Sequence, residues 1–262
     1  MMHDNHDLLI RALDEAERLA QAMQSSPTIQ TRKGEKDFAL DADHAVEQCI
    51  RDILSRSQLP ILGEENGWNQ DSANDDHIFW AVDPIDGTIN YARGLPMWGV
   101  SIALVKNSVP ILAGITFPAL QQRYVAQQDQ GAFLNGQRLQ VSITSSLQQS
   151  IVGVGDFSVG PDSFAKNQQR LALHGKLANE VLRIRMPGSA ALQLAWVAAG
   201  QTDISLVLSN HAWDVQAGVL LVREAGGVVY DRDGSEHTIH SAYTLASNSI
   251  LKNSVLDLIP EI

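Results

Sequence analysis

The chain has 262 residues, of which 44% are hydrophobic and 19% are charged, as expected of a globular protein with a sizeable core. Its 19 Lys and Arg residues and 30 Asp and Glu residues give a formal net charge of −11. This balance argues against a protein that binds the phosphate backbone of nucleic acid, which is recognised largely by Lys and Arg. It does not argue against a small phosphorylated substrate whose charge is neutralised by metal ions.

Cysteine content and apolar runs restrict the compartment. A single cysteine, Cys49, cannot form an internal disulfide, and no Cys/His cluster indicates structural zinc. No apolar run approaches the roughly 18 residues of a membrane span. Residues 1–7 lack the basic-then-apolar layout of a secretory signal. We therefore expect a cytoplasmic protein of the α/β or α+β class, with neither a membrane nor a nucleic acid as its partner.

The first 60 residues are predicted to hold two helices. Apolar residues recur at helical spacing from Leu9 to Met23. They recur again after Asp43, and Pro60 closes this second segment. The polar stretch between the helices, residues 33–37, is typical of a loop or hairpin.

From residue 78 the pattern becomes that of β-strands. Residues 78–82 form a short apolar run typical of a strand buried on both faces, and we expect it to end at Asp83-Pro84. The runs 100–105, 111–117 and 123–127, followed by an Asn135-Gly136 turn, predict an antiparallel meander.

Near residue 150 strands begin to alternate with helices. Strands are predicted at 151–154, 181–186, 228–230 and 243–246, and helices at 190–199 and 215–225. Gly226-Gly227 is predicted to cap the second helix. This change predicts an α+β half, residues 1–147, and an α/β half, residues 148–262, too closely spaced for a flexible linker.

Four short stretches place acidic residues beside turn formers or helix starts. They are Asp43, Gly63-Glu64-Glu65, residues 83–88 and Trp213-Asp214. Each also has a purely structural interpretation. Asp-Pro and Asp-Gly pairs are common in turns, Asp43 and Asp214 could cap helices, and Glu64-Glu65 could form a solvated loop.

Residues 83–88 carry the most specific chemistry. Pro84 fixes its own φ and holds Asp83 extended, and Gly87 permits a sharp reversal. The carboxylates of Asp83 and Asp86 can then point into one small volume, with the carbonyl oxygen of Ile85 between them. Carboxylates side by side repel and take up a proton or a cation at neutral pH. Oxygen-only ligands favour Mg²⁺ over zinc or copper.

Taken together, these motifs resemble the inositol monophosphatase family of Mg²⁺-dependent phosphomonoesterases. The matching stretches follow the family's order between about residues 33 and 247: 37–43 with Glu47, 63–65, 80–91, 131–136, 188–191, and 213–227. The resemblance implies a layered αβαβα sandwich of the inositol monophosphatase and fructose bisphosphatase type. It also implies a site where the halves meet and a homodimer. The residues themselves do not decide the oligomeric state.

The resemblance implies two to three Mg²⁺ ions in the site. Glu64, Asp83 and the Ile85 carbonyl oxygen would hold one ion. Asp83, Asp86 and Asp214 would hold a second. A third, weaker ion would lie near Glu64, which is thus both a metal ligand and part of the catalytic group.

The catalytic residues implied by the family are Asp43 and Thr88, together with Glu64. Asp43 and Thr88 would orient and deprotonate the water that attacks phosphorus in line, while the second ion stabilises the leaving alkoxide. The N–H groups of Gly87 and Thr88, at the start of a helix, would face the phosphate.

Other residues are assigned to the periphery of the site. Gly188, Ser189 and Ala190 form a turn where small residues let the backbone approach the alcohol, or else simply allow close helix packing. Glu65 would steady its neighbours, and Trp213 would be a packing anchor beside Asp214. Arg183 and Arg185 are as well explained by ion pairing as by phosphate binding. Further candidates for substrate contact are Asp203, Asn210 and His211, and Asp156 or Asp203 would suit an amine.

Two departures from the family pattern concern the acid Asp43 and the substrate. Ala39-Leu40 replaces the usual Val-Thr pair. Val207 stands where inositol-specific members often carry a glutamate that bonds ring hydroxyls, and valine makes no such bond. The predicted activity is hydrolysis of a small phosphate monoester, with inositol 1-phosphate first. The alternatives are histidinol phosphate, a 3′(2′),5′-bisphosphate nucleotide and fructose 1,6-bisphosphate, and, in a different class, a non-catalytic metal-binding scaffold.

Overall fold

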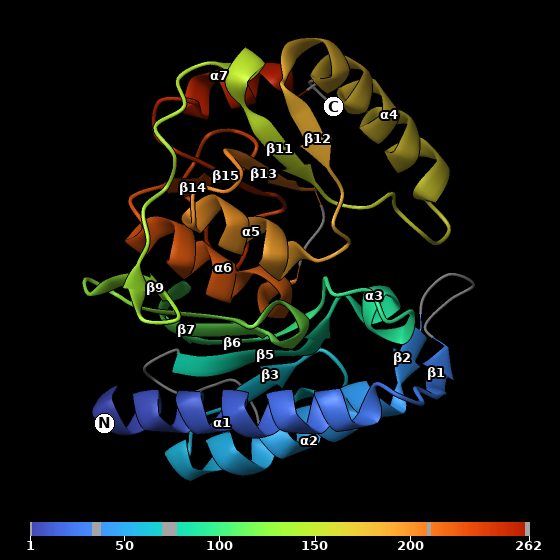
Figure 1. The fold of residues 1–262 in the computed structure, drawn as a ribbon, viewed down its shortest axis with the longest axis vertical. Coiled ribbons are helices and arrows are strands. Elements are labelled where there is room, and N and C mark those ends of the chain that lie inside the picture. Colours follow the sequence, from blue (N-terminus) through green and yellow to red (C-terminus); the bar gives the residue numbers. More distant parts are fainter. Residues whose placement is uncertain (1, 33–37, 70–77, 209–210, 260–262) are drawn as a thin grey trace.

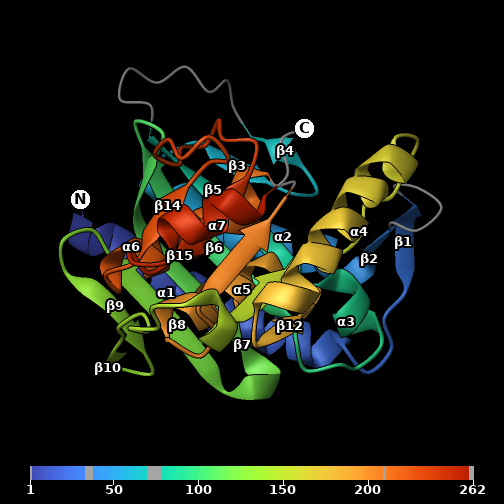
Figure 2. The ribbon, with the colours of Figure 1, turned by 90° about the horizontal axis from the view of Figure 1, so that it is seen from above.

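Helices and sheets alternate in five layers through the computed structural model (Figure 1), which describes residues 2–32, 38–69, 78–208 and 211–259. Helices α1 (Met2–Met23) and α2 (Asp41–Leu54) cover one face of an eight-stranded sheet formed by the described residues. Between this sheet and a five-stranded sheet lie α5 (Ala190–Ala198) and α6 (Ala212–Glu224). Viewed from above (Figure 2), α4 (Ser163–Glu180) and α7 (Lys252–Leu258) lie over the outer face of the second sheet. The αβαβα class predicted from the sequence is confirmed.

The eight-stranded sheet contains the predicted antiparallel meander. Its order is β10-β9-β8-β7-β6-β5-β3-β4. The strands are β3 (Ile61–Gly63), β4 (Gly67–Trp68), β5 (Ile78–Asp86), β6 (Gly99–Lys106), β7 (Val109–Phe117), β8 (Gln122–Gln127), β9 (Gly131–Leu134) and β10 (Gln137–Arg138). Strand β3 runs parallel to β5, whereas each consecutive pair of strands from β5 to β10 is antiparallel.

The expected end of β5 at Asp83-Pro84 is wrong. The strand continues to Asp86, and its register on β6 shifts between Asp83, which is opposite Ser101, and Asp86, which is opposite Gly99. Pro84 has no backbone N–H and cannot donate a hydrogen bond to β6. The register shift leaves Pro84 at a position where the pairing does not require that donor. Both carboxylates therefore lie on one irregular strand end.

The five-stranded sheet has mixed pairing. Its order is β12-β11-β13-β15-β14. The strands are β11 (Ile151–Val154), β12 (Arg183–Arg185), β13 (Ile204–Val207), β14 (Val228–Tyr230) and β15 (Thr244–Ser247). Strand β11 is parallel to β12 and β13, and β15 is antiparallel to β13 and β14. The predicted strands are present, while β13 and α7 were not predicted.

Smaller elements complete the chain. Strands β1 (Ile29–Arg32) and β2 (Phe38–Leu40) pair antiparallel, and the loop predicted at 33–37 lies outside the described residues. Helix α3 (Thr88–Ala92) follows β5, and short 3₁₀ turns occur at Ser55–Ser57, Pro118–Leu120 and Leu147–Gln149. Within the described ranges, no helix combines the length and the apolar character needed to cross a membrane.

Both halves of the chain build the central helical layer's core. Ala103 and Val105 of β6 belong to the same buried cluster as Leu194 of α5 and Leu220 of α6. The two α-helices touch closely, because a Cβ added to Gly218 would lie 2.5 Å from the Cβ of Leu194. Strands of the first sheet end at residue 138 and those of the second begin at 151. The division into domains at residue 147 stays a prediction.

Candidate active site

The negative charges of acidic side chains from both halves of the chain raise the pKa of one buried carboxyl group at the end of β5. Asp83 is 2% exposed. Burial is the main cause that raises the pKa of Asp83 well above its ordinary value, followed by the negative charges of Glu64, Asp86, Asp214 and Asp43. The other four acids singled out in the sequence therefore lie within electrostatic range of Asp83.

The end of β5 is held in a tight turn. The Ile85 N–H donates to Asp83 Oδ1 over 3.1 Å. Thr88 Oγ1 lies 3.2 Å from the Ile85 carbonyl oxygen and 3.4 Å from Asp43 Oδ1. Gly87 has a φ of 89°, and a Cβ there would lie 2.9 Å from the carbonyl oxygen of Met97. Only glycine suits this turn, which leads directly into α3.

Asp43 and Asp214 occupy equivalent positions in the first turns of two helices. Leu40, which precedes α2, donates its N–H to Asp43 Oδ2 (2.9 Å), and His211, which precedes α6, donates its N–H to Asp214 Oδ2 (3.1 Å). Each carboxylate thus satisfies a backbone donor at the start of its helix. The other oxygen of Asp43 faces Thr88, so one side chain both caps α2 and contacts a candidate catalytic residue.

Asp86 is bound by the N-terminus of α5. Its carboxylate accepts hydrogen bonds from the Ser189 hydroxyl and from the N–H groups of Ala190 (3.1 Å) and Ala191 (3.0 Å). Burial raises the pKa of Asp86 to about 6, although these hydrogen bonds act in the opposite direction. The Ser189 hydroxyl and the Ala190 N–H, in the turn predicted to lie beside the alcohol, are directed at Asp86. Their substrate role stays a prediction.

The turn before α5 is tied to α3 as well. Asn90 Nδ2 donates to the carbonyl oxygens of Met97 (2.7 Å) and Pro187 (2.8 Å) and lies 3.4 Å from that of Gly188. A Cβ on Gly188 would lie 3.4 Å from Asp156 Oδ2, so Asp156 borders this turn. Burial raises the pKa of Asp156, and the positive charge of Arg170 opposes that shift.

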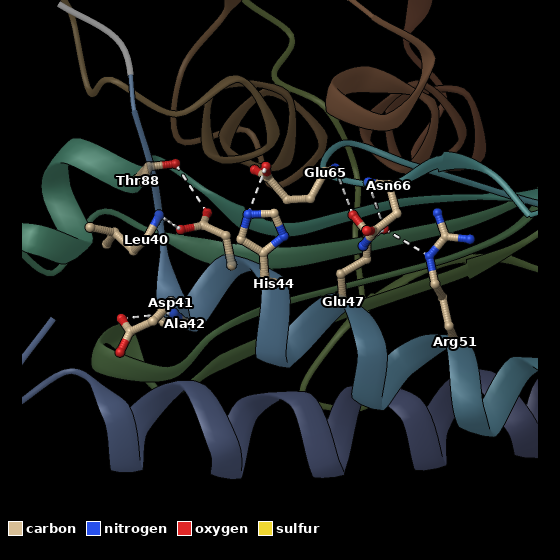
Figure 3. Close-up of polar contacts among 10 residues, drawn as sticks. Leu40, Asp41, Ala42, His44, Glu47, Arg51, Glu65, Asn66 and Thr88 are labelled. Atoms are coloured by element: carbon tan, nitrogen blue, oxygen red, sulfur yellow. Dashed lines mark hydrogen bonds and ion pairs between the residues drawn. The ribbon is translucent and has the colours of Figure 1, made fainter. Parts of the chain in front are cut away.

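Glu64 and Glu65 follow β3, and Figure 3 shows the neighbourhood of Glu65. The Glu64 N–H donates to the Val82 carbonyl oxygen (3.2 Å), which continues the pairing of β3 with β5. The Glu65 side chain is 3% exposed, and its Oε2 lies 3.8 Å from His44 Nε2. Glu65 therefore turns toward α2, and its supporting role in the site stays a prediction.

Several peripheral candidates have other surroundings. The expectation that Asp203 contacts substrate is wrong, because its buried carboxylate accepts hydrogen bonds from Ser142 Oγ (2.6 Å) and Ile151 N–H (2.7 Å). Arg183 and Arg185 are exposed on β12, and each guanidinium bonds the carbonyl oxygen of the residue before it. Neither geometry indicates phosphate binding.

The segment before α6 brings an aromatic pair beside Asp214. The rings of His211 and Trp213 are stacked, with centroids 4.6 Å apart and 15° between their planes. Asn210 lies outside the described residues. Val207, at the end of β13, is buried in the cluster between the sheets and presents no polar group.

The donor chemistry of this site fits a hard divalent cation. Among the residues that the structure describes, no three His, Cys, Asp or Glu side chains already converge closely enough to hold an ion. The acids around Asp83 are nevertheless oxygen donors whose mutual repulsion raises its pKa, and a bound cation would relieve that repulsion.

The layered αβαβα fold and the family match below define the class of the protein, the phosphoric monoester hydrolases. The chain belongs to the inositol monophosphatase family, whose sequence model matches residues 8–262. Two curated relatives and a solved structure illustrate its range.

The fructose-1,6-bisphosphatase/inositol-1-monophosphatase of Thermotoga maritima is 32% identical over 237 residues, 89% of this chain and 87% of its own. The Nus factor SuhB of Escherichia coli (strain K12) is 34% identical over 259 residues, 97% and 95% of the two chains. The solved inositol monophosphatase from Anabaena (Nostoc) has a TM-score of 0.87 at 31% identity, covering 99% of this chain and 97% of its own. These names differ in activity, so they do not fix the substrate of this chain.

Proposed function

We propose that the protein hydrolyses a small phosphate monoester to an alcohol and inorganic phosphate, with inositol 1-phosphate as the first candidate substrate. The observation that carries this proposal is the Asp83 carboxyl group, buried at the end of β5 and acted on by four further acids from both halves. The names of two relatives, each of which includes inositol monophosphatase activity, support the same reaction. A cytoplasmic homodimer remains our expectation from the sequence and the family.

The proposed metal ligands are those assigned from the resemblance. Glu64, Asp83 and the Ile85 carbonyl oxygen would hold one Mg²⁺. Asp83, Asp86 and Asp214 would hold a second, with a third near Glu64. Bound ions would neutralise the phosphate and lower the pKa of a water molecule. The net negative charge of the protein is then compatible with an anionic substrate.

The proton that leaves the attacking water is assigned to Thr88 and Asp43. Thr88 Oγ1 would accept it and pass its own proton to Asp43 Oδ1, 3.4 Å away. The Leu40 N–H fixes the other oxygen of Asp43, so that Oδ1 stays directed at Thr88. One acid and one hydroxyl, together with bound cations, would suffice here, because phosphoryl transfer depends mainly on positioning and charge neutralisation.

The phosphate and the alcohol are assigned to two neighbouring backbone segments, the start of α3 and the turn at Gly188. The N–H groups of Gly87 and Thr88 would face the phosphate at the start of α3, and the alcohol would lie toward the turn at Gly188. Buried Val207 offers the alcohol no hydrogen bond. The specificity for inositol ring hydroxyls that a glutamate would supply is therefore missing at this position.

A kinetic panel tests this function. Phosphate release from inositol 1-phosphate, histidinol phosphate, fructose 1,6-bisphosphate and a 3′-phosphonucleotide is measured with Mg²⁺ and after chelation. We expect Mg²⁺-dependent release from at least one ester, and the ratio of kcat/KM values identifies the preferred one. If no ester releases phosphate in the presence of Mg²⁺, the catalytic proposal fails and a non-catalytic scaffold becomes the better account.

A further inference from the structure

The loop that carries Glu64 is hydrogen-bonded to one buried side chain of α2. Glu47 is wholly buried. Its Oε2 accepts the Glu65 N–H (2.8 Å), and its Oε1 accepts the Asn66 N–H (3.2 Å) and Asn66 Nδ2 (2.9 Å). Figure 3 shows Glu47 directly beside Glu65 and Asn66. Both oxygens of one carboxylate thus bind the two residues that follow Glu64.

Arg51 completes this arrangement one helical turn later. Its Nε donates to Glu47 Oε1 (2.7 Å), and its Nη2 donates to the Gly67 carbonyl oxygen (2.5 Å). Glu47 and Arg51 are both buried, so their charges neutralise each other away from water. The pair holds residues 65, 66 and 67 of a single loop.

The loop contacts the Glu47–Arg51 pair closely at Gly63. A Cβ on Gly63 would lie 2.4 Å from Glu47 Oε1 and 2.7 Å from Arg51 Nη2. Any larger residue would displace either the loop or the Glu47–Arg51 pair. The backbone of Glu64 therefore starts at a glycine packed against the pair and ends at residues that hydrogen-bond to it.

The same helix also carries Asp43 in its first turn, four residues before Glu47. Residues four apart lie on one face of a helix. One rigid element thus presents Asp43 to the site directly and fixes Glu64 through the loop. Their relative position is set by α2.

We propose that Glu47 and Arg51 are positioning residues, which hold the 63–67 loop so that Glu64 is presented to the divalent cation. This inference rests on the proposed function, in which Glu64 is a metal ligand. Groups that orient metal ligands typically contribute a factor of about 10 to 100 in metal affinity. A residue that served only folding would change stability without changing that affinity.

Glu47→Gln is the sharpest substitution. Glutamine keeps the shape and one oxygen for Arg51, but its amide places a donor opposite either the Glu65 N–H or the Arg51 and Asn66 donors. We expect divalent-cation binding to weaken by about 10- to 100-fold, with kcat at saturating Mg²⁺ within about threefold of the parent.

The matched control lies on the same helix. Asp52 accepts a hydrogen bond from Gln48 Nε2 (2.7 Å) at an exposed position, again four residues apart. Asp52→Asn makes the same acid-to-amide change and removes the same charge without touching the loop. Metal affinity of this variant should equal that of the parent.

The experiment titrates Mn²⁺ into metal-free, full-length protein and follows free Mn²⁺ by electron paramagnetic resonance, with a thermal melt of each variant. Parent, Asp52→Asn, Glu64→Gln and Glu47→Gln are compared. Weaker binding in both Glu64→Gln and Glu47→Gln, with Asp52→Asn unchanged, supports the inference. Weaker binding in Glu64→Gln alone overturns the inference and leaves the proposed function standing. Unchanged binding in Glu64→Gln removes the metal role of Glu64 and overturns the inference, whereas hydrolysis of phosphate esters is decided separately by the kinetic panel.

Asn66→Ala covers the case in which Glu47→Gln does not fold. It deletes one side-chain hydrogen bond to Glu47 from an exposed residue and keeps the buried pair intact. About threefold weaker Mn²⁺ binding is expected, the effect of one modest hydrogen bond on the loop. Parent-like affinity in this folded variant would overturn the inference.

Discussion

The two oxygens of the Asp43 carboxylate have different partners. Oδ2 accepts the N–H of Leu40, and Oδ1 faces Thr88 Oγ1. Helix capping and a place in the site were alternatives when only the sequence was considered, and the structure contains both arrangements. Leu40, where the family pattern has threonine, has no side chain that can cap α2, and its own backbone N–H is satisfied by Asp43.

Thr88→Val tests the proton path at the level of one atom. Valine keeps the branched shape and removes the hydroxyl that lies between Ile85 and Asp43. We expect kcat to fall by about 10²- to 10⁴-fold, with little change in KM, because a positioned proton acceptor acts in the transition state. Steady-state kinetics at saturating Mg²⁺ measure this. A kcat within tenfold of the parent would rule out the assigned role.

His237 should make the protein less stable in mild acid. It is 1% exposed, and its Nε2 lies 2.8 Å from Thr244 Oγ1. Burial, aided by the positive charge of Arg223 and opposed by Asp231, lowers the pKa of His237 to about 4 from the ordinary 6.5. Between these pH values the unfolded chain binds a proton that the folded protein does not, so the free energy of unfolding falls as the pH drops from 6.5 toward 4.

The expected contribution of His237 is roughly 2 kcal/mol of stability lost between pH 7 and pH 5. Urea unfolding at both pH values measures it. In His237→Gln the loss over the same interval should be smaller by that amount, because glutamine does not titrate. An equal loss in the variant and the parent would show that other groups are responsible.

At the scale of elements, the sequence predicts those helices and strands whose formation depends on residues close together in the chain. The runs 100–105, 111–117 and 123–127 correctly predicted the antiparallel strands β6, β7 and β8, and the Asn135-Gly136 turn lies between β9 and β10. The continuation of β5 through Pro84 depends on a register shift against β6, which no local pattern of residues 83–86 contains. Helix α4 was missed because, of its 18 residues, all within the described part of the chain, only Arg170, Leu173 and Leu177 are buried. Its apolar stripe is too narrow to give a helical signal.

Two helical glycines should respond oppositely to alanine. A Cβ on Gly218 would lie 2.5 Å from Leu194 Cβ, where α5 and α6 touch, whereas a Cβ on Gly175 in α4 meets nothing within 4 Å. We expect Gly218→Ala to destabilise by about 1–3 kcal/mol through overpacking. Gly175→Ala should stabilise by about 0.5–1 kcal/mol through helix propensity. Urea unfolding at pH 7 measures both, and changes of the same sign would refute the packing argument.

At the scale of the whole molecule, the site depends on both halves of the chain. Asp83 and Asp86 come from the first sheet, Asp214 comes from α6, and Ser189 binds Asp86 across 103 residues of sequence. Composition and periodicity contain no information on such pairings. The resemblance to a family supplied the candidate set, and the structure supplied the bonds from α5 to Asp86 and the role of Asp203 between Ser142 and Ile151.

The central claim is that acids from both halves bind divalent cations at one place, beside Asp83. Crystals grown with Mn²⁺ and measured at the manganese absorption edge test it directly. The account predicts anomalous density in contact with the Asp83 carboxylate, with Glu64 among the ligands of one ion and Asp214 among those of another. Anomalous density only at positions remote from Asp83, in crystals of protein that hydrolyses phosphate esters with Mn²⁺, would contradict it.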